Sequence, residues 1–359
     1  MRSCVSVALA ALLVGGMGTA YPAYDPVLTV PDPAADGERI PDETPLTDLA
    51  GAINLLDCGC QPTGCSPASC CPSCCCCPCW TVTADAMFLR RSKALRQTLL
   101  LDLIAPNTSL LDARQLSFDC EPGIRLNFIR HGDGYRDLEV GYFMTDGWHA
   151  RANVQTPAML MADRYGGPPV QNAAVSYRSE LHNVEINLCQ YENDWLTPLI
   201  GLRYAGIGER YHVAGQEAGS LDDYAYNINV ANHLYGVQAG AKILVKERYR
   251  FRADGVVKAG LYANAASEHV AYNSFQWGYR SSSDKGGRCA FIGELGINLT
   301  YDLTEWLALR GTYQIMWIEG VALAPNQIPT ADISGGPSSV RAAGGLFYYG
   351  AQAGIEAVW

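Results

Sequence analysis

The feature that most constrains the fold is a period-two alternation of apolar and other residues, repeated along residues 80–359. In AFIGELGINLTYD at 290–302, one face carries Phe291, Leu295, Ile297, Leu299 and Tyr301. Similar stretches occur at 182–188, 237–246, 254–264 and 347–359. Because successive side chains of a strand point to opposite faces, each stretch predicts a β-strand with one apolar face and one face that is polar or contains glycine.

Two architectures satisfy this pattern: a soluble sandwich or barrel with an apolar core, and a membrane barrel with lipid outside and a polar interior. Soluble strands usually have about five or six residues, whereas membrane-spanning strands need about nine to eleven. The alternating stretches reach the longer range. Tryptophans recur near their ends, which is typical of interfacial aromatic girdles but would also suit a soluble core: Trp148, Trp195, Trp277, Trp306 and Trp317.

The connection lengths predict an all-β, antiparallel transmembrane barrel of about ten strands. The strands are expected at 80–91, 117–130, 134–147, 173–190, 194–212, 224–246, 249–265, 288–302, 305–318 and 345–359. The links alternate long and short, as in outer-membrane barrels with long external loops and tight periplasmic turns. Twelve strands are the alternative, because 224–246 is long for one strand and EHVAYNSFQW within 266–287 could pair. Either count leaves a lumen between packed and narrow.

The inward side of the alternation supplies the candidate functional residues. Both charge signs occur among the candidate lumen-lining residues, which are Arg125, Glu139, Glu185, Lys242, Lys258, Glu294, Arg310, Gln352 and Glu356. Charged rings select ions only where water remains in the pore. These residues therefore suit a conducting channel and a salt-bridged polar plug equally well.

The first 79 residues have a different character. Residues 1–20 combine a positive start, an apolar stretch too short to span a bilayer and small residues before a cleavage point, which predicts a secretory signal peptide. The polar, proline-rich residues 21–57 are expected to form a flexible linker. A cysteine-rich segment at 58–79 then precedes the barrel at 80–359, and the whole extension is expected in the periplasm.

Ten of the chain's fourteen cysteines lie in that segment: Cys58, Cys60, Cys65, Cys70, Cys71, Cys74, Cys75, Cys76, Cys77 and Cys79. Outside the cytoplasm thiols tend to oxidise, so disulfides or crosslinks between molecules are the favoured interpretation. The partner would be a second copy or another envelope component. Metal binding, which uses well-spaced thiolate pairs, and compositional drift without a role are the alternatives.

Composition and motifs argue against two further function classes. The net charge of −10 opposes a nucleic-acid partner, because phosphate binding requires clustered Lys and Arg. No GxSxG or HExxH motif occurs, and no catalytic residue, cofactor or metal ligand is predicted. His149, His212 and His269 are expected near the outer rim, close to Asp146, Glu217 or Glu268. A chain of this size places some histidine and acid near any rim, so we do not expect an enzyme.

Trp359, with apolar residues at alternate preceding positions, is a candidate assembly signal. It resembles the C-terminal signal by which outer-membrane barrels are handed to the barrel-assembly machinery. The alternative is an ordinary edge strand that ends in tryptophan.

Several phrases carry a resemblance to a known family: WTVTADAMFLRRS at 80–92, LHNVEINL at 181–188, NHLYGVQAGAKI at 232–243, CAFIGELGINLTY at 289–301 and YQIMWIEGVALAPNQI at 313–328. They resemble β-barrel outer-membrane proteins of planctomycetes, related to the pore-forming major outer-membrane proteins described first in Legionella. The resemblance covers about residues 80–359 and implies a porin-like barrel for passive diffusion of ions or small solutes. The alternative function is a structural envelope protein with a plugged barrel, crosslinked through its cysteine-rich segment.

Overall fold

The computed structural model describes residues 79–359, apart from 95, 106–107, 133–135, 157–158, 162–168, 218–222, 277 and 331–338. The predicted signal peptide, the linker and the candidate crosslinking cysteines from Cys58 to Cys77 lie outside the described residues. The first strand begins at Trp80.

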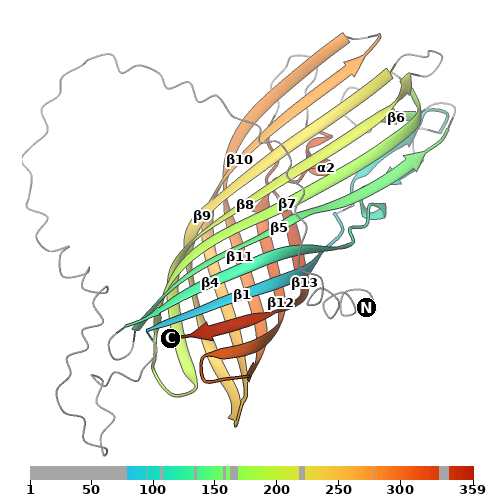
Figure 1. Ribbon diagram of the computed structural model, residues 1–359. Coiled ribbons are helices and arrows are strands. Elements are labelled where there is room, and N and C mark those ends of the chain that lie inside the picture. Colours follow the sequence, from blue (N-terminus) through green and yellow to red (C-terminus); the bar gives the residue numbers. More distant parts are fainter. Residues whose placement is uncertain are drawn as a thin grey trace, which may run out of the picture. The chain divides into compact units, whose positions relative to one another are not determined.

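Ten antiparallel strands pair in one closed ring (Figure 1). In ring order they are β1 (Trp80–Arg91), β4 (Cys120–His131), β5 (Arg136–Val154), β7 (Val170–Gln190), β8 (Leu196–Glu217), β9 (Asp223–Arg248), β10 (Phe251–Ser274), β11 (Gly278–Asp302), β12 (Leu307–Val321) and β13 (Gly344–Val358). Each strand pairs with the next, and β13 pairs back with β1. The prediction of an antiparallel barrel with about ten strands is confirmed.

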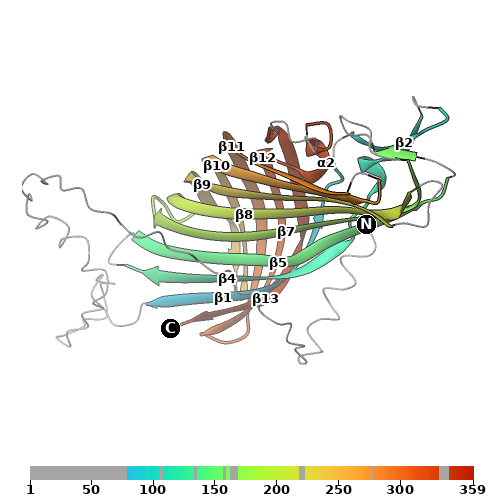
Figure 2. The ribbon, with the colours of Figure 1, turned by 90° about the horizontal axis from the view of Figure 1, so that it is seen from above.

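The connections divide the barrel into two rims. The links β4–β5, β7–β8, β9–β10 and β11–β12 are short and lie at the same rim as Cys79 and Trp359, which we call the short-turn rim. The opposite rim carries most of the smaller elements (Figure 2). These are β2 (Thr98–Asp102), β3 (Ser109–Asp112), the 3₁₀ helix η4 (Ala113–Gln115), β6 (Met159–Met161) and α2 (Ala324–Gln327). Over the described residues, no helix is both long and apolar enough to cross a membrane.

Two predicted long loops are wrong, because the strands continue through them. β10 runs on to Ser274 and β11 begins at Gly278, so 266–287 is the end of a hairpin. β8 and β9 likewise take up most of 213–223. The physical reason is that the period-two pattern persists there, with Val270 and Tyr272 buried between outward neighbours. The strands therefore extend well past the length that a membrane needs.

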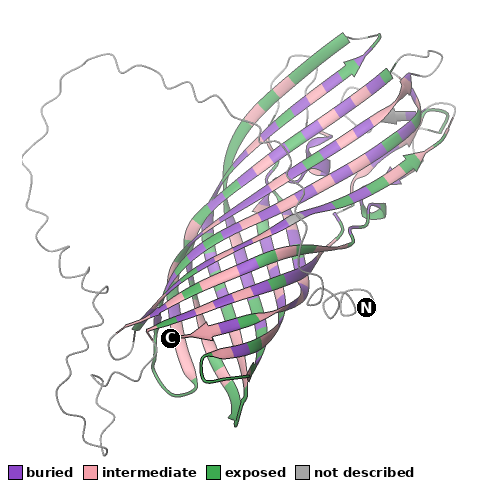
Figure 3. Ribbon diagram, in the orientation of Figure 1, coloured by how far each residue is buried: buried purple, intermediate pink, exposed green. Residues whose placement is uncertain are grey.

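Buried and exposed residues alternate along the strands (Figure 3), and in the half of the barrel next to the short-turn rim the burial is inside out. Outward apolar side chains there are exposed, for example Ile200 at 61 % and Leu202 at 63 %. Inward ionic side chains there are buried, for example Arg203 and Glu294. We call this outward apolar zone the apolar band. Its polarity is that of a barrel surrounded by lipid, as the sequence predicts.

The polarity reverses farther along the same strands. On β5 the change follows a bulge between Thr145 and Trp148, where Gly147 has a φ of +102° that favours glycine. Beyond it, Trp148 and Ala150 are buried inside while His149 and Arg151 are exposed outside. This half of the barrel therefore has the polarity of a water-soluble β-structure.

An apolar core fills the interior of this second half. It combines buried residues of the β1–β4 and β12–β13 connections with inward aromatic side chains of the strands. The connections supply Leu99, Leu111, Leu116, Phe118, Leu323, Ala324 and Ile328, and the strands supply Trp148, Tyr177, Tyr211, Tyr226, Tyr272 and Tyr348. We call these residues of the two connections the plug, because they close the barrel interior on the side away from the short-turn rim.

Candidate functional site

All nine sequence-predicted lumen residues lie on the inward side of the barrel. Eight of them line one vestibule of about 820 Å³: Arg125, Glu139, Glu185, Lys242, Lys258, Glu294, Arg310 and Glu356. The vestibule extends from the turn residues 191–195 at the short-turn rim into the apolar-band half of the barrel. The ninth, Gln352, is buried beside it and donates a hydrogen bond to Gln314. The inside of the barrel at the level of the apolar band is therefore ionic and open from one side.

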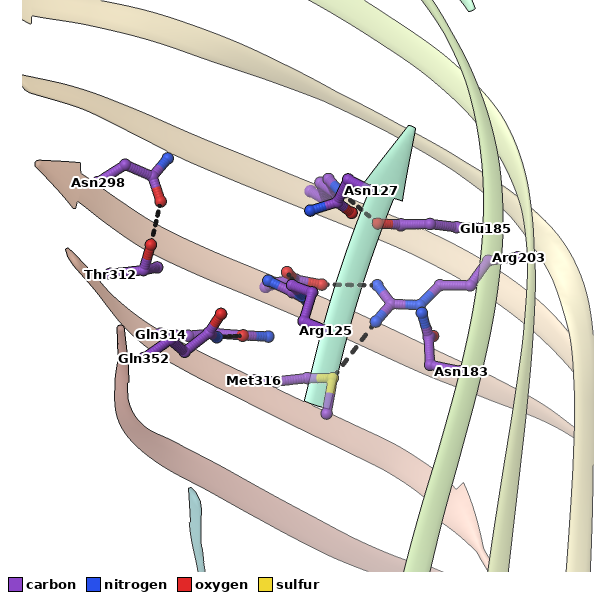
Figure 4. A network of polar contacts seen from close by, with 12 residues as sticks. Arg125, Asn127, Asn183, Glu185, Arg203, Asn298, Thr312, Gln314, Met316 and Gln352 are labelled. Carbon is purple, nitrogen blue, oxygen red and sulfur yellow. Dashed lines mark hydrogen bonds and ion pairs between the residues drawn. The ribbon is translucent and has the colours of Figure 1, made fainter. Parts of the chain in front are cut away.

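The inner end of the vestibule is built around Glu294. Its carboxylate accepts from Arg125 Nη2 at 3.1 Å and from Arg203 Nη1 at 2.8 Å. Arg203 also donates to the Asn183 side chain at 2.5 Å. Arg125 lies on β4, Arg203 on β8 and Glu294 on β11, and no two of these strands are neighbours in the ring. The ion pairs therefore cross the lumen and narrow it (Figure 4). The cluster therefore works as a constriction.

A second chain of ion pairs lines the wall between β5 and β10. Lys258 Nζ lies 2.7 Å from Glu185 Oε1 and 3.8 Å from Glu139 Oε1. Lys242 donates to the other oxygen of Glu139. Gln238 Nε2 bridges to Glu185 Oε2 at 2.8 Å. Each buried charge thus faces an opposite charge, which burial in a low-dielectric interior requires.

A third group lies nearer the seam between β13 and β1. Arg252 Nη2 lies 2.5 Å from Glu356 Oε1, and Arg310 Nη1 lies 3.7 Å from Glu356 Oε2. Among the described residues, the inward face of the apolar-band half holds six cations and seven carboxylates. The cations are Arg125, Arg203, Lys242, Arg252, Lys258 and Arg310, and the carboxylates are Asp85, Asp137, Glu139, Glu185, Asp254, Glu294 and Glu356. The lumen therefore has no large excess of one sign that would select anions or cations.

The polar lumen ends where apolar side chains of the strands meet the arginines. The guanidinium of Arg125 lies 4.9 Å from the ring centre of Phe143, and Arg203 Nη2 lies 3.4 Å from the Met316 sulfur. Phe143 and Met316 are both buried. They belong to the apolar core that includes the plug, so the vestibule is closed at this end.

A hydrogen-bonded chain ties three strands and one turn together at the short-turn rim. Thr81 Oγ1 and His131 Nε2 are 2.8 Å apart, and His131 Nδ1 and Asp137 Oδ2 are 2.9 Å apart. The Tyr191 hydroxyl donates to the same Asp137 oxygen at 2.7 Å. The chain joins β1, β4, β5 and the β7–β8 turn, so it fixes the mouth of the vestibule.

Arg203 and Arg252 line the lumen but are not among the residues predicted to do so, although the sequence signal for both is present. Arg203 alternates with the outward residues Ile200, Leu202 and Tyr204, which places it inside by the same period-two rule. Arg252 stands at the inward position directly after the tight β9–β10 turn.

The histidines expected at the outer rim do not meet the expected acids Glu217 and Glu268. Adjacent residues of a strand point to opposite faces, so His269 is exposed outside while Glu268 is buried inside. His269 Nδ1 instead lies 2.8 Å from Ser283 Oγ, and His212 Nδ1 lies 2.6 Å from Asn227 Oδ1. Within the described part of the chain, no group of three or more His, Cys, Asp or Glu side chains forms a metal-binding arrangement.

The remaining candidate residues lie at the seam of the barrel. The backbone N–H groups of Cys79 and Trp80 donate to the Trp359 carbonyl at 2.7 and 2.8 Å. Cys79 is the one candidate crosslinking cysteine within the described residues, and it is half-buried. Trp359 itself is 61 % exposed.

Comparison with known proteins finds barrels only at a distance. No protein-family model matches the chain, and no curated protein matches it. The outer-membrane protease OmpT from Escherichia coli is 11% identical, with 78% of this chain and 96% of that chain covered and a TM-score of 0.45. The translocator domain of the autotransporter NalP from Neisseria meningitidis is 9% identical (78% and 88% covered, TM-score 0.38), and the P. putida toluene transporter TodX is 9% identical (78% and 89% covered, TM-score 0.31). At these values the likeness carries no argument about activity.

Proposed function

We propose that the chain is an outer-membrane β-barrel channel for ions or small polar solutes, closed in this conformation. The observation that carries the proposal is the ionic vestibule at the level of the apolar band. Burying ion pairs costs desolvation energy that well-packed apolar side chains of similar volume avoid. A barrel with a purely mechanical role could therefore fill its interior with apolar residues, whereas a path for polar solutes needs this lining.

The outer-membrane location is supported by the polarity of the wall. Exposed apolar side chains circle the half that carries the tight turns, and tight turns face the periplasm in bacterial barrels of this kind. Cys79 lies at the same rim, which supports a periplasmic N-terminal extension. The resemblance to planctomycete barrels supports a planctomycete as the source organism.

The plug is the proposed gate, because the β12–β13 connection that carries part of it is anchored to the barrel wall by a few polar contacts. Asn232 donates to the Ala322 carbonyl at 2.8 Å and accepts from the Ala322 N–H at 2.7 Å. Glu209 accepts from the Ala324 N–H at 2.7 Å. Movement of the β12–β13 connection away from these anchors would unplug one side of the lumen while the ten paired strands stay in place.

Planar-bilayer conductance of the full-length protein tests the proposal. Asn232→Leu removes both hydrogen bonds to Ala322 while keeping the number of side-chain heavy atoms, and Asn229→Leu makes the same change at an outward residue of the same strand as the matched control. We expect Asn232→Leu to raise the fraction of time spent in unitary open steps, with the control like wild type. Folded protein, identified by its changed electrophoretic mobility on boiling, that stays silent in both variants would refute the channel.

The structural envelope protein is the second candidate, and the filled interior of the plug-bearing half favours it. In this function the cysteine-rich segment crosslinks the barrel to a second copy or to another envelope component. High-molecular-weight bands from freshly prepared, thiol-blocked membranes should then collapse on addition of reductant. Monomeric bands under the same conditions would count against this function.

A further inference from the structure

One cavity beyond the apolar band is lined by more carboxylates than cations. It has a volume of about 880 Å³ and lies along the neighbouring strands β7 to β11. Its acidic lining residues are Glu180, Glu209, Glu268 and Asp284, its basic ones are Arg210 and Lys285, and His269 lines it as well. The cavity therefore carries an excess of negative charge.

Two of the four acids and both cations are accounted for. Glu209 is engaged by an ion pair and two hydrogen bonds on the inner side of the barrel. Glu180, Arg210 and Lys285 occupy outward positions of their strands. The remaining two acids share the inward side of the cavity.

These two acids, Glu268 on β10 and Asp284 on β11, are direct partners in the strand register. Directly opposed side chains have Cβ atoms about 4.5–5.5 Å apart. Asp284 is directed inward, because its Oδ2 accepts from the Val340 N–H of the β12–β13 connection at 2.9 Å. Two like charges at this spacing destabilise a sheet.

The Glu268 carboxylate has no protein partner. Its residue is 3 % exposed, and neither carboxylate oxygen has a hydrogen-bond partner among the described residues. The inward side chains around it are apolar, with Val230 opposite on β9 and Ala266 and Val270 along β10. Buried charges in proteins are normally paired or bound to a metal, so this carboxylate lacks a positive partner.

The described cations do not provide that partner. On the inward side of β11, Arg280 and Arg288 each stand four residues from Asp284, about 13 Å along the strand. Of the surrounding charges, that of Asp284 acts on the Glu268 carboxyl, and no described cation offsets it. The pair therefore suits a cation that comes from solution.

We propose that Glu268 and Asp284 hold a Ca²⁺ ion between them on the inward side of the cavity. Ca²⁺ takes roughly six to eight oxygen ligands at about 2.3–2.6 Å and tolerates irregular geometry, whereas Mg²⁺ demands a near-ideal octahedron. Two carboxylates fixed on paired strands supply part of the Ca²⁺ shell, and the cavity has room for the water molecules that complete it.

Through Asp284 the ion also acts on the β12–β13 connection, because the same carboxylate holds the Val340 N–H. A bound ion fixes the Asp284 side chain and so keeps this end of the connection against the barrel wall. The binding site is independent of whether the lumen conducts. Its action on the connection rests on the gate proposed above.

Isothermal titration calorimetry of the full-length folded protein in detergent tests the site, with CaCl₂ as the probe after metals have been removed with EDTA. The titration is made at pH 8, above the pKa of about 7 that burial and the Asp284 charge give Glu268. Glu268→Gln and Asp284→Asn each remove one carboxylate. Without the ion the two carboxylates repel each other, so neither variant is expected to lose its fold. Glu180→Gln removes an outward acid of the same cavity and is the matched control.

We expect wild type and control to bind Ca²⁺ alike, and the affinity to fall on the order of tenfold or more in each variant of the pair. Wild-type affinity in both pair variants would overturn the proposal, as would an equal loss in the Glu180→Gln control. Absence of Ca²⁺ binding by wild type, or tighter binding of Mg²⁺ than of Ca²⁺, would overturn it as well.

Trypsin cleavage at Arg341, which is exposed directly after Val340, reports on the connection. Ca²⁺ should slow this cleavage in wild type relative to EDTA and leave it unchanged in Glu268→Gln. Binding of Ca²⁺ without protection of Arg341 would refute the action on the gate and leave the site in place. Protein that binds Ca²⁺ but stays silent in bilayers would refute the channel alone.

Discussion

Neutralising Glu209 should release the plug, because this carboxylate joins the barrel wall to α2. It accepts from Arg91 Nη2 at 2.5 Å, from the Tyr177 hydroxyl at 2.6 Å and from the Ala324 N–H at 2.7 Å, and both side chains of the ion pair are fully buried. Glu209→Gln keeps an acceptor for Ala324 but leaves the charge of Arg91 unpaired.

The magnitude follows from the environment of Arg91. Removing one partner of a buried ion pair costs about 3–5 kcal/mol. Arg91 keeps a 2.9 Å hydrogen bond to Tyr177 and lies 4.6 Å above the Phe118 ring, so the lower end applies. About 3 kcal/mol changes the equilibrium between plugged and unplugged states by roughly a hundredfold, at about 1.4 kcal/mol per factor of ten.

The assay combines limited trypsin digestion with bilayer conductance. Arg341, which is exposed within the β12–β13 connection, is the reporter site, and we expect its cleavage and the open-channel fraction to rise together. Glu305→Gln at the short-turn rim is the control, because Glu305 is exposed. Wild-type cleavage and conductance in folded Glu209→Gln would refute the assignment of Glu209 as the anchor.

Three further perturbations test other parts of the structure. Glu294→Gln leaves the two arginines of the constriction without their shared carboxylate and should lower the free energy of unfolding by about 3–5 kcal/mol in denaturant titrations; an unchanged free energy would contradict the assignment of these ion pairs as buried. Ile200→Lys places a charge on the apolar band and should cost about 2–4 kcal/mol in vesicles, whereas Asn229→Lys beyond the band should cost close to zero; equal costs would contradict the assignment of the band. Burial, reinforced by the nearby Asp284 charge, raises the pKa of Glu268 from 4.5 to about 7, so the folded state holds the extra proton and stability falls as pH rises between these values. Glu268→Gln should therefore raise the denaturation midpoint at pH 8 and leave it unchanged at pH 4; the same gain at both pH values would show that its carboxyl is not the cause.

The strands were predictable because the period-two pattern is local. It needs only neighbouring residues, so β1 was predicted at its observed bounds and the ten-strand ring followed from the links. The same rule places Glu185, Lys258 and Glu294 inside. β5, β8, β10 and β11 were predicted too short at their ends away from the short-turn rim, because the pattern changes sign there: apolar residues move inward and polar residues outward, which resembles the end of a membrane strand.

The plug could not be predicted in the same way. The segments 92–116 and 319–344 have no sustained periodicity, and contacts between distant residues hold them, such as Glu209 with Ala324 and Asn232 with Ala322. Closure of the vestibule is therefore a tertiary property.

The seam at Trp359 has a mechanical consequence. The cysteine-rich segment enters the barrel through Cys79, directly before β1, which is hydrogen-bonded along its length to β13 on one side and β4 on the other. Antiparallel ladder bonds run perpendicular to the strands. A pull along β1 therefore loads both ladders in shear, so that many bonds share the force at once, whereas peeling would break them one by one. A tether attached at this point would resist tension with the strength of the whole seam.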